Sequence, residues 1–185
     1  MGEQHKKHSR REHLNDFHLN IAGEYVYDGA LYACQNDDAK QRRSKRAVWG
    51  MAAILTVAVA AGGCIPAPGM QNCFYVLLPY LGEFLGAVSV IWALAKLGTD
   101  WSTVREYNYK KSVAVLPVRT AVTAVFSLLG IVCELIFFFV NDHAGQTFFA
   151  LLYVLLKLIA LLSVLVLRAE IMQAEWDKLP KKDNF

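Results

Sequence analysis

Four long apolar stretches constrain this chain more than any other feature of its sequence. They cover residues 47–65, 74–97, 117–140 and 147–168. At about 1.5 Å of rise per residue, a helix of each stretch is long enough to cross a hydrocarbon layer of about 30 Å. The 185 residues are 55% apolar, against about 45–50% in an average soluble domain. The sequence therefore predicts an all-α polytopic membrane protein, a bundle of four transmembrane helices.

Little chain remains outside these stretches for a separate folded domain. The longest piece is residues 1–46, which is shorter than the about 50 residues at which independent domains usually begin. A separate soluble catalytic domain is thereby excluded, and the sequence shows no phosphate-binding glycine loop, no Ser/His/Asp grouping and no HExxH pattern. We expect a basic N-terminal segment, a membrane domain over residues 47–168 and a tail over residues 169–185, with no enzymatic activity and no cofactor.

Lys and Arg are distributed unevenly between the loops. They are frequent in residues 1–46, in the loop after the second span and in the tail, and absent from the turns 66–73 and 141–146. Positively charged segments near a span stay in the cytoplasm. We therefore expect both termini inside, most simply in the cell membrane. The basic N-terminal segment is tethered to the inner leaflet, so we expect anionic lipid as its partner and no nucleic acid.

The segments that flank the spans have local signals of their own. Asp28-Gly29, within residues 21–34, suits a tight hairpin turn. An isolated two-stranded hairpin is marginal in water, so an irregular aromatic segment at the membrane surface remains the alternative. We expect the last span to continue as an amphipathic helix through Trp176 until Pro180 stops it.

An internal repeat is suggested by sliding the chain along itself. A shift of 74 aligns residues 45–95 with residues 119–169 without a gap and gives ten identical positions. Two apolar segments share many positions by chance, but equal span and turn lengths are not forced by composition. Duplication of a two-span unit and chance similarity both remain open.

Three ionisable residues lie inside the spans, where an unpaired charge is costly. Counted from the outer ends of the spans, Glu83, Glu134 and Lys157 lie about 14, 9 and 15 Å deep. Glu83 and Lys157 are equivalent under the shift of 74, which predicts an ion pair between them. Glu134 then has no cationic partner and requires protonation, a wet cavity or a bound cation. Either these charges hold the helices together, or they form a site for a proton, a cation or a small solute.

Cysteines and small residues complete the pattern. Cys64 and Cys73 bracket the first outer turn, where thiols are usually oxidised, so we expect a disulfide between them. Two seams of small residues predict close helix contacts, and they consist of Ala52, Thr56, Ala60 and Cys64 on the first span and Gly82, Gly86, Ser89 and Ala93 on the second. The Gly82-x-x-x-Gly86 pattern is equally typical of a homo-oligomer interface.

Four histidines of the N-terminal segment are spaced irregularly, so we expect no metal site there; they are His5, His8, His13 and His18.

The sequence features together lead to two hypotheses of function. The first hypothesis is a non-enzymatic scaffold or accessory subunit that binds a protein partner on its cytoplasmic face through aromatic residues near Tyr25, Tyr107 and Trp176. The second is a small proton- or cation-coupled transporter that uses the three intramembrane charges.

Overall fold

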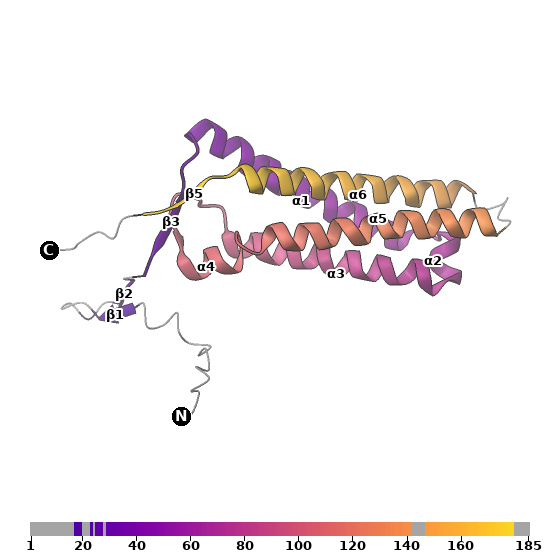
Figure 1. Cartoon of the computed structure of the whole chain (residues 1–185), viewed down its shortest axis with the longest axis horizontal. Helices are drawn as coiled ribbons and strands as arrows, with labels where there is room; N and C mark the ends of the chain where they lie inside the picture. The colour runs from indigo at the N-terminus through magenta and orange to yellow at the C-terminus, as the bar shows by residue number, and fades with distance from the viewer. Residues whose placement is uncertain (1–16, 20–22, 24, 28, 142–146, 180–185) are drawn as a thin grey trace, which may run out of the picture.

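The computed structural model describes residues 17–19, 23, 25–27, 29–141 and 147–179. Four long helices lie side by side in an elongated bundle (Figure 1), and they are α1 (Asp38–Cys64), α3 (Phe74–Leu97), α5 (Leu116–Val140) and α6 (Thr147–Gln173). All four are long and apolar enough to cross a membrane. The predicted all-α membrane bundle is therefore confirmed.

The helices form a ring in which each helix packs against two others. α1 packs closely against α6 and more loosely against α3, and α5 packs closely against both α3 and α6. α1 therefore lies diagonally opposite α5, and α3 lies diagonally opposite α6. A two-fold axis along the bundle would exchange the members of each diagonal pair, as a duplicated two-span unit requires.

The buried faces of the helices test the register of that repeat. In α3 and α6 the buried positions coincide at a shift of 74, as in the pairs Val76/Ala150, Glu83/Lys157, Val90/Val164 and Leu97/Ile171. In α1 and α5 no buried position coincides at a shift of 74, whereas a shift of 75 brings together pairs such as Val48/Thr123, Ala52/Ser127, Val59/Glu134 and Gly62/Phe137. One residue turns a helix by about 100°, so the ungapped alignment fails in its first half.

A small sheet closes one end of the bundle. Its strand order is β4 (Val104–Arg105), β3 (Leu31–Cys34) and β5 (Trp176–Lys178), and both pairings are antiparallel. Beside it, β1 (Phe17–Leu19) pairs with β2 (Tyr25–Tyr27).

Two expectations for the segments that flank the spans are wrong, namely the hairpin at Asp28-Gly29 and the continuation of the last helix through Trp176. The strands on either side of Asp28-Gly29 pair with other segments rather than with each other, and Asp28 itself lies outside the described residues. The last helix ends at Gln173, because the next residues supply a strand to β3.

Aromatic side chains pack beneath this sheet, and we call the sheet, α4 (Glu106–Lys111) and these side chains the cap. The rings of Tyr32 and Tyr109 stack 4.2 Å apart, and those of Trp101 and Trp176 lie 5.8 Å apart. Trp101 is buried within the same apolar core as residues of α1, α3 and α6. Trp101 and Trp176 therefore join the cap to the bundle.

The opposite end of the bundle is closed by the short helix α2 (Pro68–Asn72). Ala67, Pro68 and Gly69 are buried, and α2 packs against α3, α5 and α6. The predicted disulfide between Cys64 and Cys73 is wrong, because both cysteines are free. The turn between α1 and α3 is filled by α2, and Cys64 ends α1 at the exposed surface while Cys73 donates its backbone N–H to Gly69 O at 2.9 Å. We call this the plugged end.

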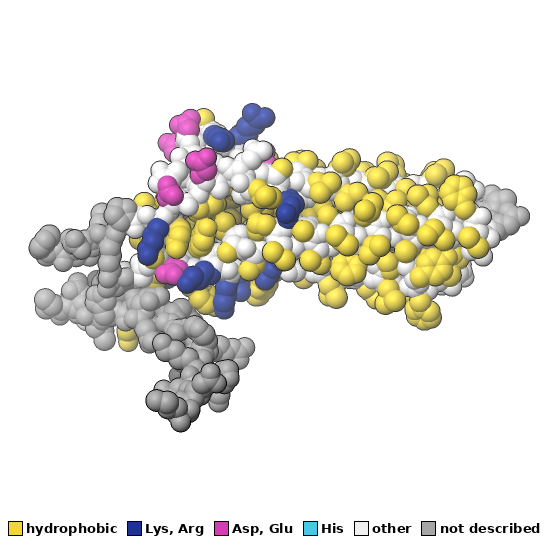
Figure 2. Space-filling view, in the orientation of Figure 1, with side chains coloured by type: hydrophobic (Ala, Val, Ile, Leu, Met, Phe, Trp, Pro, Cys, Tyr) yellow, Lys and Arg dark blue, Asp and Glu magenta, His cyan; other side chains and the backbone are white. Residues whose placement is uncertain are grey.

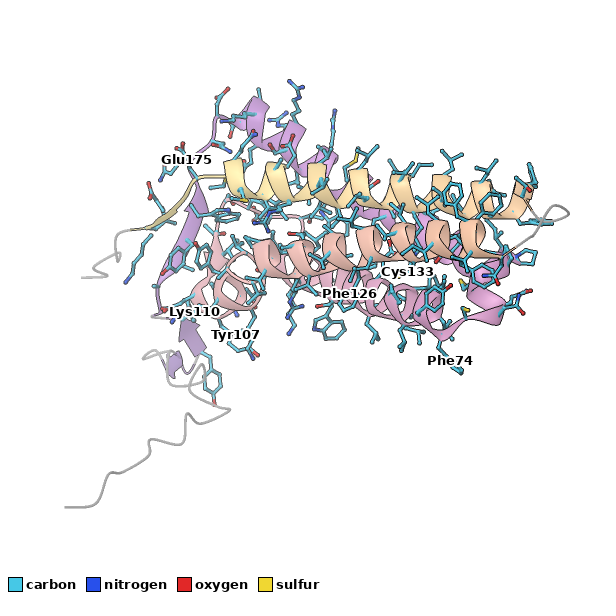
Figure 3. All side chains as sticks on the ribbon, turned by 45° about the vertical axis from the view of Figure 1, so that its right-hand side comes forward. Phe74, Tyr107, Lys110, Phe126, Cys133 and Glu175 are labelled. Atoms are coloured by element: carbon cyan, nitrogen blue, oxygen red, sulfur yellow. The ribbon has the colours of Figure 1, made fainter. Side chains whose placement is uncertain are left out.

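The two predicted seams of small residues have different outcomes, because the one on α3 makes a close helix contact and most of the one on α1 does not. A Cβ on Gly82 would meet the Phe126 ring at 2.5 Å, and one on Gly86 would meet Thr123 Oγ1 at 2.5 Å. The Gly82-x-x-x-Gly86 face therefore packs against α5 of the same chain, and Figure 3 shows Phe126 where α5 and α3 meet. The seam predicted on α1 is wrong beyond Ala52, because Thr56, Ala60 and Cys64 are exposed on the bundle surface.

Candidate intramembrane site

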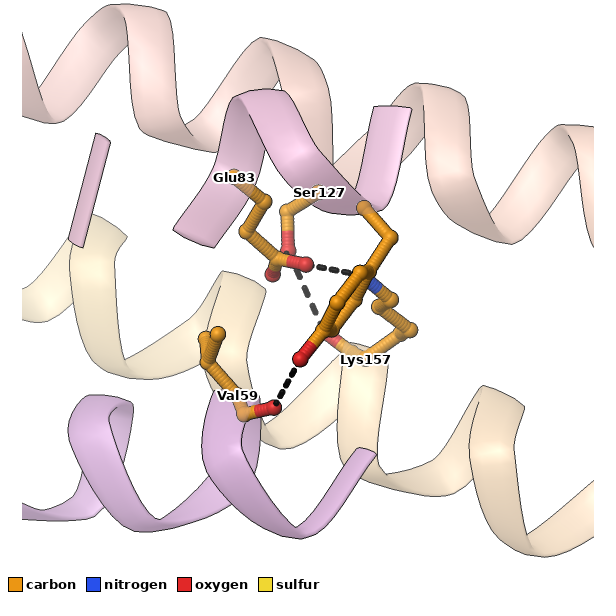
Figure 4. Close-up of polar contacts among 5 residues, drawn as sticks. Val59, Glu83, Ser127 and Lys157 are labelled. Carbon is orange, nitrogen blue, oxygen red and sulfur yellow. Dashed lines mark hydrogen bonds and ion pairs between the residues drawn. The ribbon is translucent and has the colours of Figure 1, made fainter. Parts of the chain in front are cut away.

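An ion pair crosses the centre of the bundle. Glu83 on α3 is 0% exposed and Lys157 on α6 is 3% exposed, and Lys157 Nζ donates to Glu83 Oε2 (Figure 4). The other carboxylate oxygen, Glu83 Oε1, accepts a hydrogen bond of 2.5 Å from Ser127 Oγ on α5. The predicted pair is present, and its two long side chains join helices that lie diagonally across the ring.

Aromatic rings and a glycine accommodate the Lys157 ammonium. Its Nζ lies 4.8 Å from the centre of the Tyr80 ring and 5.2 Å from that of Tyr153, an arrangement that stabilises a desolvated cation. The Tyr80 hydroxyl donates to Val59 O at 3.4 Å and so connects α3 to α1. A Cβ on Gly130 would lie 3.4 Å from Lys157 Nζ, so this glycine leaves room for the ammonium.

The interior face of α5 is polar along much of its length. Its buried residues include Thr120, Thr123, Ser127, Gly130 and Glu134, a spacing that keeps all five on one side of a helix. The two threonine hydroxyls donate to carbonyls of their own helix, both at 2.8 Å. Ser127 and Gly130 were missed in the sequence, although their spacing from Glu134 is a signal that could have revealed them.

Glu134 lies near the plugged end and differs from Glu83 in its surroundings. It is 0% exposed, and neither carboxylate oxygen has a hydrogen-bond partner among the described residues. The backbone amide of Gly69 interacts with it short of a full hydrogen bond, and a Cβ on Gly69 would collide with Oε2. Lys157 also interacts with it electrostatically.

The hydroxyl of Tyr153 is a second buried group at the same level. Tyr153 is 0% exposed, its hydroxyl lacks a hydrogen-bond partner in the described part of the chain, and it interacts electrostatically with Glu83 and Glu134. Its ring also faces Lys157. The three predicted residues therefore belong to one buried cluster, in which Tyr153 lies near both acids and the base.

Metal coordination has little support in the described residues. No group of three or more His, Cys, Asp or Glu side chains gathers within them. Of the N-terminal histidines, His5, His8 and His13 lie outside the described residues, whereas His18 is in β1.

Comparison with known proteins adds no assignment to this site. No family model, no curated protein and no solved structure matches the chain. The class of protein is accordingly defined by the fold alone, as an integral membrane protein with four helices that can span a bilayer.

Proposed function

We propose that this chain is a non-enzymatic scaffold or accessory subunit of a membrane assembly. The observation that supports this proposal is the cap. Its three-stranded sheet combines residues 31–34, 104–105 and 176–178, which are far apart in the sequence. Two further contacts hold the cap end together, because Cys34 N donates to Trp101 O at 3.1 Å and Ser44 Oγ donates to Glu170 Oε2 at 2.7 Å. A fixed surface of this kind suits binding of a partner better than a set of independent loops does.

Charge indicates which side of the membrane the cap faces. The described part of the chain has no Lys or Arg between Arg46 and Lys96, and only Lys157 between Arg119 and Arg168. Figure 2 shows charged side chains gathered toward the capped end and apolar side chains along the rest of the visible face. By the positive-inside rule we place the cap and both termini in the cytoplasm, where its basic residues bind anionic lipid.

Single-cysteine labelling in a cysteine-free background tests this orientation. Lys178 in β5 and Gln71 in α2 are exposed at the two ends of the bundle. We expect a cysteine at position 71 to react with an impermeant reagent added outside intact cells, and one at position 178 to react only after permeabilisation. Labelling of position 178 from outside would reverse the orientation.

Purification in a mild detergent tests the scaffold proposal. We expect a protein partner to co-purify stoichiometrically with the full chain, and Tyr25→Ser to reduce its yield because Tyr25 at the capped end is 75% exposed. Phe74→Ser is the matched control, since Phe74 is 81% exposed but lies at the opposite end (Figure 3). Equal loss of the partner from both variants, or no stoichiometric partner at all, would argue against the capped end as a docking surface.

A second candidate function is a small proton- or cation-coupled transporter that uses Glu83, Glu134 and Lys157. The observation that favours it is the buried Glu134 carboxyl, which has no hydrogen-bond partner among the described residues. Intramembrane ionisable groups of this kind are common on ion and proton pathways. Purified protein in liposomes should then show proton- or cation-dependent uptake that Glu134→Gln abolishes.

A further inference from the structure

Two buried polar groups near the plugged end lack, among the described residues, the hydrogen-bond partners that such groups normally have. They are the Glu134 carboxyl on α5 and the Tyr153 hydroxyl on α6, both 0% exposed. Buried polar atoms in folded proteins are nearly always hydrogen-bonded, and a partnerless carboxylate costs far more than a neutral group does. The arrangement is therefore incomplete when Glu134 is charged and nothing else is bound.

The charge balance of the cluster shows what is missing. Lys157 forms its ion pair with Glu83, and Ser127 takes the second oxygen of the same carboxylate. An ionised Glu134 would leave the cluster with one negative charge in excess, within a helix bundle that is surrounded by lipid. One positive charge bound at Glu134 restores neutrality.

The groups around Glu134 favour a proton over a metal ion. α5 packs against α2, α3 and α6, which contribute the Gly69 amide, the Tyr75 hydroxyl, and Tyr153 together with Lys157 to its surroundings. An amide N–H and an ammonium both repel a metal cation. Ions such as Ca²⁺ require about six to eight oxygen ligands, whereas a proton requires only the carboxylate oxygen that it binds.

We propose that the Glu134 carboxyl, covered by Gly69 of α2, is a reversible proton-binding site of the membrane domain. The carboxylate takes up one proton and becomes a neutral carboxylic acid, and it releases the same proton to water at the plugged end. This inference rests on the second candidate function, for which it names the coupled ion. α2 controls access to the site, because its buried residues separate the carboxyl from the outer solution.

Infrared difference spectroscopy of the full chain in lipid nanodiscs tests the site without any transport assay. We expect a carbonyl band of a protonated carboxylic acid at neutral pH, which disappears as the pH is raised. Glu134→Gln should remove this band, and Glu134→Asp, which keeps an acid at the same place, should retain one. Glu175→Gln is the control, because Glu175 is exposed in the loop before β5 and its loss should leave the band unchanged.

Two glycine variants test the role of α2. Gly69→Ala places a methyl group against Glu134 Oε2 and should displace α2 from the carboxyl. Water then stabilises the charged form, so the band should disappear at a lower pH than in the native chain. Gly50→Ala is the matched control, because a Cβ on Gly50 meets nothing within 4 Å.

The outcomes separate the site from the transporter. A band that persists in Glu134→Gln, or the absence of any such band from the native chain, would overturn the site. A band that changes with sodium concentration at constant pH would show a metal ion as the occupant and would overturn the proton. If Glu134 titrates but the liposomes show no flux, the proton-binding site stands and the transporter function is rejected. If the liposomes show flux but Glu134 does not titrate, the transporter function stands and the proton-binding site is rejected.

Discussion

The centre of the bundle and its plugged end each contain a buried glutamate, but the groups that surround the two carboxyls differ. Glu83 and Glu134 are both 0% exposed and lie on helices that pack against each other. Glu83 is bound by Lys157 and Ser127, whereas neither oxygen of Glu134 has a hydrogen-bond partner among the described residues. Equally buried carboxyls therefore have a cationic and a hydroxyl partner at one place and no hydrogen-bond partner among the described residues at the other, and the neighbouring helices set this difference.

Breaking the central pair should have the largest effect on stability. Glu83→Gln leaves the Lys157 ammonium without its counter-ion in the bundle interior, and removing one partner of a buried pair costs about 3–5 kcal/mol. Glu83→Gln combined with Lys157→Gln should recover much of this loss. The free energy of unfolding in mixed micelles measures both effects.

The exposed pair at the capped end is the control for this double-mutant cycle. Lys110 and Glu106 form an ion pair in α4 with the lysine side chain 66% exposed, and such helix pairs contribute about 0.3–0.5 kcal/mol. Glu106→Gln should therefore hardly change the free energy of unfolding. A central double variant that is no more stable than the worse single variant would contradict the pairing and remove the distinction between the two glutamates.

Ser127 gives the next largest effect. Its hydroxyl donates to Glu83 Oε1 at 2.5 Å within the buried cluster, and a hydrogen bond to a charged group contributes about 1.5–3 kcal/mol. Ser127→Ala should lower the free energy of unfolding by this amount in the native chain. In a Glu83→Gln background the effect should shrink, and an unchanged effect there would mean that Ser127 acts through another contact.

The close approach of α3 and α5 supports that hydrogen bond. A Cβ on Gly86 would lie 3.3 Å from the Thr123 backbone, so Gly86→Ala should push the two helices apart at the level of the central pair. Overpacking of this kind costs about 1–3 kcal/mol, measurable in the same unfolding assay. Gly50→Ala, which meets open space, should instead be neutral or slightly stabilising. Equal behaviour of the two variants would argue that the helices are not in tight contact.

The sequence predicted the central pair because the positions of Glu83 and Lys157 are related by the spacing of the two span pairs. In α3 and α6 that spacing also matches the buried faces, so the prediction was reliable there. In α1 and α5 no buried positions coincide at that spacing. The seam of Thr56 and Ala60 was assigned to the wrong side for a separate reason, because small residues alone do not show which side of an apolar helix packs against its neighbours. An apolar helix lacks polar residues to mark its lipid-facing side, so packing decides the face.

The two ends of the bundle were the least predictable parts. The cap requires pairing of β3 with strands from two distant segments, and a strand of two or three residues has no periodic signal of its own. The contact of Gly69 with Glu134 depends on how α2 folds back over the helix ends. The sequence indicated that Glu134 lacks a partner, but it could not show what covers it.

A carboxyl outside the membrane shows how an accessible acid behaves. Asp100 follows α3 and accepts hydrogen bonds from Ser102 N at 3.0 Å and Ser102 Oγ at 2.6 Å, which hold its pKa below the usual value. A lowered pKa in the folded state stabilises the fold above the usual aspartate pKa, and this small contribution is lost as the pH falls through the lowered pKa. Ser102→Ala should raise the pKa of Asp100 in an NMR titration. An unchanged titration would exclude the hydroxyl as the cause.

The smallest effect on stability is expected at Glu134, and it is the result that most sharply separates the two regions. A neutral carboxyl and an amide have nearly the same shape, so Glu134→Gln should change the free energy of unfolding by less than about 0.5 kcal/mol. Under the scaffold proposal the partner still co-purifies with this variant and no other property changes. Under the transporter proposal, proton-dependent uptake is lost while folding and assembly persist. A loss of stability as large as that of Glu83→Gln would instead show that the carboxyl is ionised and paired, and the two glutamates would then have the same structural role.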